Sequence, residues 1–329
     1  MPVNDLDRHA PPSGSTDAAA VDLTTVSVVI PTFHRAHLLE EVVSPYLTDG
    51  CVSEVIIVDD GPDEPTAAVC AQLVGRSEKV IVLRQHHKGA AAARTAGAVT
   101  ATGSVLLFID DDVVAAEGTA HRHLSYHARS LQPLVVVGYM PCAIPRPRRP
   151  GQFPIYLYQR YYEGVCRKYE ADPTSVLTYL WGGHFSVQRR SFSATTPVPP
   201  NFPRHQDRLL GWYLQADGCA GVFDRTLLSE HRFERSSAQF FSDCRKSGQS
   251  QVALAAVSRS LPVALPDHEI VEQSGGLILE SVLRFGAVLG VLRMGICLAG
   301  HLHLWGVETL FARVVALGET FRGIHSRTK

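Results

Sequence analysis

The chain has 329 residues, 45% of them hydrophobic, which is enough to bury one large core or two smaller ones. Its 31 basic and 32 acidic residues give a formal net charge of −1. This balance argues against a general nucleic-acid binder, because such a protein has to neutralise many phosphates. Seven scattered cysteines include no Cys-x-x-Cys pair, so neither a zinc site nor a disulfide framework is indicated.

The first 24 residues are rich in Pro, Ser, Asp and Ala and lack the basic start and apolar stretch of a secretory signal. We interpret residues 1–24 as a disordered leader. Together with the cysteine pattern, this predicts a cytoplasmic protein.

From Val26 onward, short apolar runs alternate with segments of helical spacing. Strands are expected at 26–30, 54–58, 80–83 and 104–109, and helices at 35–47, 64–74 and 89–101. This order predicts an α/β fold, with a doubly wound, mostly parallel sheet flanked by helices. Ligands of such sheets bind beyond the carboxyl ends of the strands.

The fourth expected strand ends in three consecutive acids, Asp110, Asp111 and Asp112. Because side chains alternate along a strand, Asp110 and Asp112 are expected on one side, with Cα atoms about 6.6 Å apart, and Asp111 on the other. Two carboxylates so placed could share one divalent cation, and Mn²⁺ or Mg²⁺ suits oxygen ligands. A cation also explains why three repelling carboxylates lie together.

Three further side chains fit a nucleotide. Phe33 follows a strand-ending proline and could stack on a base, and Asp60 could accept a hydrogen bond from a pyrimidine N–H. Arg94 precedes the acidic strand and could hold the acids or a diphosphate. A core aromatic, a turn-forming Asp and a solvated Arg are the alternatives.

The ordered set of these motifs resembles a known family. The segments are 28–33, 57–61, 88–89 with 93–97, and 110–112. At these intervals they resemble the nucleotide-sugar half of family-two glycosyltransferases, which have the GT-A fold. The resemblance covers roughly residues 25 to 260. It implies an inverting transfer from a nucleoside diphosphate-sugar, with UDP-sugar preferred, to a hydroxyl-bearing acceptor such as a glycan, a lipid-linked or a small molecule.

The resemblance also assigns roles to residues. It implies that Asp110 and Asp112 bind Mn²⁺ or Mg²⁺, and that His231, after an expected strand at 222–228, joins them. A buried structural histidine is the alternative for His231. The donor-binding set it implies is Pro31, Phe33, Arg35, Asp60, Arg94, Asp110, Asp111, Gly183 and His184. His184 stands where the family usually has a small polar residue.

Residues 205–214 resemble the family segment whose Glu-Asp pair supplies the catalytic base. Gln206 replaces the glutamate, while Asp207 keeps the acid at an expected helix start, where the helix dipole favours its ionised form. The resemblance therefore implies that Asp207 is the base, and a simple N-cap is the alternative.

Two other segments have more than one interpretation. The expected helix 115–130 carries His123 and His127 at metal-ligand spacing, but no Glu or Cys partner, so we expect an exposed or lid-facing helix. The tyrosines between 156 and 162 could form an acceptor surface or pack on the core.

The resemblance divides the chain into a transferase domain at 25–270, with halves 25–138 and 139–270, and an apolar helical extension at 271–329. The longest uncharged run of the extension, 294–307, has 14 residues and is short of the roughly 20 that a membrane span needs. Packing on the catalytic domain, a homodimer interface and contact with a membrane surface through 275–320 all remain open.

Two other functions remain as alternatives. A catalytically inactive nucleotide-sugar-binding partner subunit would fit Gln206 and the apolar extension. A nucleotidyltransferase would need a Gly-rich phosphate loop after the first strand, and residues 31–35 contain no glycine.

Overall fold

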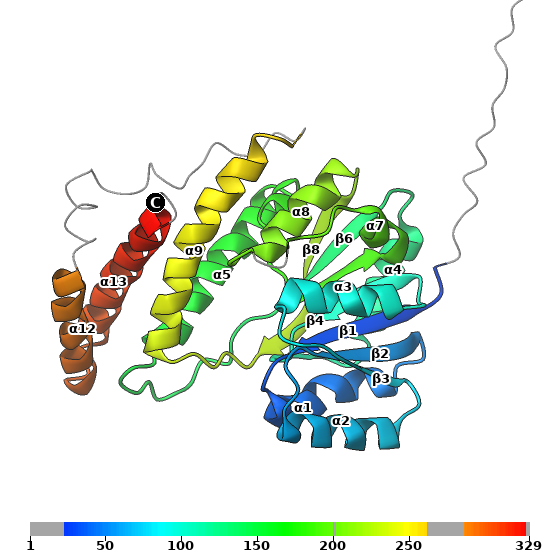
Figure 1. Ribbon diagram of the computed structural model, residues 1–329, viewed down its shortest axis with the longest axis horizontal. Helices are drawn as coiled ribbons and strands as arrows, with labels where there is room; N and C mark the ends of the chain where they lie inside the picture. Colours follow the sequence, from blue (N-terminus) through cyan, green and yellow to red (C-terminus); the bar gives the residue numbers. More distant parts are fainter. Residues whose placement is uncertain (1–22, 200–201, 262–285, 327–329) are drawn as a thin grey trace, which may run out of the picture.

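The computed structural model describes residues 23–199, 202–261 and 286–326. A curled mixed sheet with helices on both faces forms the body of the protein, and a helical layer covers one side (Figure 1). The expected leader up to residue 22 and the expected domain boundary near residue 270 lie outside the described residues.

The first half contains all seven expected elements, with bounds within about two residues of those expected. They are β1 (Val26–Thr32), α1 (Ala36–Leu47), β2 (Val52–Asp59), α2 (Glu64–Arg76), β3 (Val80–Arg84), α3 (Ala90–Thr100) and β4 (Val105–Ile109). The strands are parallel in the order β3-β2-β1-β4. Helices α1 and α2 cover one face and α3 the other, which buries Val28 and Val29 on opposite sides of β1.

The second half makes the sheet mixed. Its elements are β5 (Val113–Ala115), α4 (Thr119–Arg129), β6 (Leu134–Tyr139), α5 (Phe153–Ala171), α6 (Ser175–Thr178), β7 (His184–Gln188), α7 (Arg189–Ala194), α8 (Gln206–Ala216) and β8 (Ala220–His231). Strand β7 lies antiparallel between β4 and β6, and β5 pairs antiparallel with β8 at the edge. In that last pair Val113 faces His231, so the sheet itself brings His231 beside the acidic residues that follow β4.

Three helices complete the described chain: α9 (Ser237–Ser258), α12 (Gly286–His301) and α13 (Trp305–Ser326). The expectation of a helical extension is confirmed for 286–326. Helix α13 packs very closely on α9, because a Cβ atom added to Gly248 would lie 2.1 Å from the Thr320 carbonyl oxygen. In the part of the chain that the structure describes, no helix is long and apolar enough to cross a membrane.

Buried ion pairs fasten this helical layer to the body. Glu308 on α13 is fully buried and accepts hydrogen bonds from Arg148 (2.6 Å) and from the Gly151 amide (2.9 Å). These contacts hold the proline-rich loop 141–151 against α13. That loop has no helix, as its composition predicts.

Candidate active site

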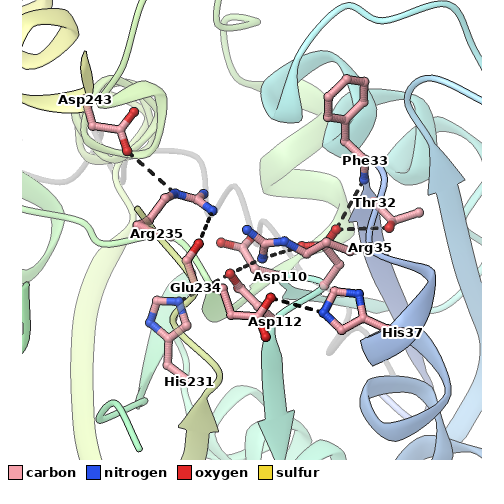
Figure 2. Close-up of polar contacts among 12 residues, drawn as sticks. Thr32, Phe33, Arg35, His37, Asp110, Asp112, His231, Glu234, Arg235 and Asp243 are labelled. Carbon is pink, nitrogen blue, oxygen red and sulfur yellow. Dashed lines mark hydrogen bonds and ion pairs between the residues drawn. The ribbon is translucent and has the colours of Figure 1, made fainter. Parts of the chain in front are cut away.

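The three acids lie on a turn beyond β4. The Val113 amide donates to the Asp110 carbonyl at 3.0 Å, so the chain leaves strand geometry directly after Ile109. The expectation that Asp111 points away from its neighbours was wrong for this reason. Asp111 accepts hydrogen bonds from the Thr32 hydroxyl (2.9 Å) and the Phe33 amide (3.2 Å) at the end of β1. Figure 2 labels Thr32 and Phe33 beside Asp110 and Asp112.

A single arginine neutralises two of the acids. Arg35 Nη1 lies 3.2 Å from Asp111 Oδ1 and forms a close ion pair with Asp112 Oδ2. His231 Nε2 lies 3.4 Å from that same Asp112 oxygen. Burial alone would raise the pKa of Asp112, but His231 and Arg35 hold that pKa below its ordinary value. Asp112 is therefore ionised at neutral pH.

Asp111 behaves differently from Asp112. Burial raises its pKa to about 6, with Asp112 and Asp110 adding to the rise and Arg35 opposing it. Near neutral pH the cluster therefore holds less negative charge than three ordinary aspartates would.

A second arginine links the acidic turn to the expected base. Arg94 is buried, and its Nη2 lies 2.6 Å from Asp110 Oδ1 and 3.4 Å from the Gly182 carbonyl. The Gly182 amide donates to Asp207 Oδ2 at 2.6 Å. Asp110 and Asp207 thus flank the glycine turn at 182–183. A Cβ atom on Gly183 would lie 3.1 Å from Asp110 Oδ2 and 2.9 Å from Met140, so this turn has little room for side chains.

A cleft of about 890 Å³ opens over the acidic turn. One wall comes from the ends of β1, β2 and β4, and the other comes from residues 234–246 at the start of α9. The expected site residues that line this cleft are Pro31, Phe33, Arg35, Asp60, Asp110, Asp111 and Asp112. His37 Nε2 and Glu234 Oε2, 3.1 Å apart, join the two walls.

Phe33 and Asp60 line the cleft at the ends of β1 and β2. Phe33 is 43% exposed, although its ring centroid lies 4.1 Å from that of His34 and 4.3 Å from that of His87, so part of its aromatic surface remains accessible. Asp60 is buried and accepts hydrogen bonds from Gln85 (2.6 Å) and from the Lys88 and Gly89 amides (2.8 Å each). Asp60 therefore holds the loop that leads into α3.

Residues 27–194, just over half of the chain, match the sequence family described as "Glycosyl transferase family 2". The chain belongs to glycosyltransferase family 2. No curated protein matches it significantly in sequence.

Solved structures agree with this assignment at the level of the fold. A mannosyltransferase from Pyrobaculum calidifontis, solved in complex with GDP-Man and Mn²⁺, is similar with a TM-score of 0.59 at 14% identity. The match covers 92% of this chain and 87% of that one. A mycobacterial protein is similar with a TM-score of 0.50 at 19% identity, over 73% of this chain and 76% of that one. The glycosyltransferase therefore has a GT-A-like α/β fold.

The chemistry around Asp112 suits a divalent cation held partly by substrate. Among the described residues, no group of three or more His, Cys, Asp or Glu side chains converges as metal ligands. Asp112 and His231 nevertheless offer an oxygen and a nitrogen side by side. Mg²⁺ is commonly bound through one or two carboxylates together with substrate phosphates and water. A cation on Asp112 would compete with Arg35 for the same oxygen.

His184 does not line the cleft of the glycosyltransferase. It is fully buried, with Nε2 2.9 Å from His123 Nε2 and Nδ1 3.0 Å from the Ser229 hydroxyl. His123 and His127 both reach the Ser186 hydroxyl at 2.8 Å. The expectation that their helix is exposed or lid-facing was wrong for the helix face that carries His123 and His127, because α4 packs this face on β7. Gly138 makes room for His184, since a Cβ atom there would lie 2.3 Å from the imidazole.

These histidines make the fold sensitive to acid. Burial lowers the pKa of His184 to about 3 and that of His127 to about 4. The unfolded chain then binds more protons below pH 6.5, so stability is lost as the pH falls from 6.5 toward 4. Each of the two contributes at most about 1.4 kcal/mol per pH unit to that loss in the free energy of unfolding, and about half of this at pH 6.5.

Urea unfolding between pH 7 and pH 5 measures this slope. His127→Gln should reduce the loss of stability between pH 7 and pH 5 by about 2 kcal/mol in total, whereas His121→Gln, at an exposed position on the same helix, should leave it unchanged. An unchanged slope in His127→Gln would contradict the assignment.

Gln206 has a structural role that the sequence did not indicate. Its Oε1 accepts from the Ala91 amide at 3.1 Å, and its Nε2 donates to the Phe202 carbonyl at 2.9 Å. Gln206 thus fastens the start of α8 to the first turn of α3, whose N-terminal N–H groups lack partners within the helix.

The tyrosines of α5 differ in burial, and only packing on the core is seen directly. Tyr162 is 1% exposed and packs in the core, while Tyr161 is 76% exposed. Tyr158 lies beside His231, with ring centroids 5.1 Å apart, and accepts a hydrogen bond from Trp181 at 3.0 Å. Tyr158 is therefore the aromatic residue of this helix that supports the acidic site.

Proposed function

We propose that the protein is an inverting, metal-assisted glycosyltransferase that moves a sugar from a UDP-sugar to an acceptor hydroxyl. The observation that best supports this proposal is that two acidic groups lie on either side of the 182–183 turn. One is the ion-paired acidic turn that lines the cleft, and the other is Asp207, held against Gly182.

Asp207 is the proposed catalytic base. It would take the proton of the acceptor hydroxyl while that oxygen forms a bond to C1 of the sugar. The bond from C1 to the diphosphate breaks on the opposite face, and the nucleoside diphosphate leaves with the electron pair. General-base help of this kind contributes about 10² to 10⁴ in rate.

The remaining cleft residues would bind the donor. Phe33 would stack on the base, with Pro31 shaping the strand end beneath it. Arg35 would pair with the diphosphate once it is free of Asp112, and Arg94 would keep Asp110 in place. Gly183 would let the sugar approach the backbone. We leave His184 out of this donor site because it is buried in the histidine cluster.

Asp112 and His231 are the proposed protein ligands of Mn²⁺ or Mg²⁺, with Asp110 beside them. When bound, the cation would neutralise the charge that develops on the leaving diphosphate.

A thermal-shift panel of UDP-sugars and GDP-mannose, each with and without Mn²⁺, tests the donor class. GDP-mannose belongs in the panel because the similar mannosyltransferase was solved with it. A ligand at 100 times its dissociation constant stabilises by about 2.7 kcal/mol, which is easily measured. The proposal fails if no nucleoside diphosphate-sugar shifts the melting temperature.

An inactive partner subunit would bind the donor in the same panel without turning it over. Slow, Mn²⁺-dependent release of UDP in the absence of an acceptor would support an enzyme. Donor binding with no turnover over a broad acceptor screen would favour the inactive subunit.

A further inference from the structure

An apolar strip runs along the outer edge of the helical layer. Its members, each 40% to 66% exposed, are Val291, Met294, Leu298, Leu302, Leu304, Val307 and Leu310. Three of them lie on one face of α12 at helical spacing, and the other four continue through the turn into α13. The opposite face of α12, with Leu289 and Ile296, is buried against the neighbouring helices. Figure 1 shows α12 beside α13.

The charge around this strip has one sign. Between residues 286 and 326 the only carboxylates are Glu308 and Glu319, and both are buried in ion pairs with arginines. Arg293 is 47% exposed at its side chain and pairs with Glu319 at 2.9 Å, and Arg313 is exposed. Arg149 is exposed and precedes Pro150 in the chain. Pro150 packs close to α12, because a Cβ atom added to Gly300 would lie 3.3 Å from Pro150 Cβ. The surface of this segment is therefore apolar and cationic.

The apolar strip and the positive charge together indicate which kind of partner binds this surface. In a two-fold dimer the same patch meets itself, and residues 286–326 of the second copy would offer these arginines no exposed carboxylate. An anionic bilayer accepts both parts of the surface, since the apolar side chains enter the acyl boundary and the arginines meet the headgroups.

We propose that the outer face of α12 and the start of α13 dock the protein on an anionic lipid bilayer. Helix α13 packs on α9, and the first turns of α9 line the cleft (Figure 1). Docking would thus hold the cleft one helical layer away from the membrane. This inference does not rest on the proposed catalytic activity.

Co-sedimentation of the full chain with phosphatidylglycerol/phosphatidylcholine vesicles tests the proposal, with pure phosphatidylcholine vesicles alongside. We expect binding to the anionic vesicles that weakens as salt is added. The double variant Met294→Gln/Leu298→Gln should lower the affinity by about tenfold or more, because each buried methylene contributes about 0.8 kcal/mol. Arg313→Gln and Arg149→Gln should each lower it by about fivefold.

Matched controls come from exposed positions elsewhere on the protein. Val99→Gln/Leu131→Gln removes two exposed apolar side chains, and Arg129→Gln removes one exposed arginine. Neither should alter vesicle binding. The proposal is overturned if the wild-type chain does not bind anionic vesicles, or if the strip variants bind as well as the controls. It is also overturned if light scattering shows a dimer that Met294→Gln/Leu298→Gln dissociates, since the strip would then be a subunit interface.

Discussion

Replacing Asp207 by asparagine is expected to lower the transfer rate by about 10² to 10⁴ while donor affinity stays within a few-fold. Asparagine keeps the size of the side chain and an oxygen for the Gly182 amide, which now lies 2.6 Å from Asp207 Oδ2. It cannot take up the proton of the acceptor. Steady-state transfer kinetics and donor binding, measured on the same preparation, separate the two effects.

Asp217→Asn is the matched control, because Asp217 is an exposed acid at the far end of the same helix. It should change neither quantity. The N-cap alternative for Asp207 predicts a nearly silent substitution, but the structure assigns the N-cap position to His205. A well-folded Asp207→Asn protein that retains more than about a tenth of the transfer rate would exclude Asp207 as the base.

The second large effect is expected at Asp112. Asp112→Asn should abolish the Mn²⁺-dependent part of donor binding, because it removes the charge that Arg35 and His231 now hold ionised. Arg35 would still pair with Asp111, so the turn should remain folded. The measurement is the donor-induced shift in melting temperature, with and without Mn²⁺.

Glu117→Gln controls for the loss of one negative charge nearby, since Glu117 is an exposed residue outside the cleft. Its Mn²⁺-dependent shift should equal that of the wild type. If Asp112→Asn binds donor and Mn²⁺ with wild-type affinity, Asp112 is not a metal ligand. The melting temperature without ligands must accompany both measurements, because Asp112 is buried.

The sequence by itself predicted the first half of the fold because its information is local. Apolar strands and helical spacing alternate there, neighbouring units pack on one another, and parallel pairing follows from the crossovers. The same locality predicted that the acids after β2 and β4 lie at one edge of the sheet. Asp60, Asp110 and Asp112 indeed line one cleft.

Only the tertiary structure decided which side chains meet in the second half. His231 reaches Asp112 through the β5–β8 register, between segments more than 100 residues apart. Strand β7 is buried on both faces, so His184 lies in the interior although polar residues on alternate positions are typical of a solvent-facing side. Asp207 meets Gly182 because α8 packs beside the 182–183 turn. Such pairings depend on long-range packing, and no spacing within one segment encodes them.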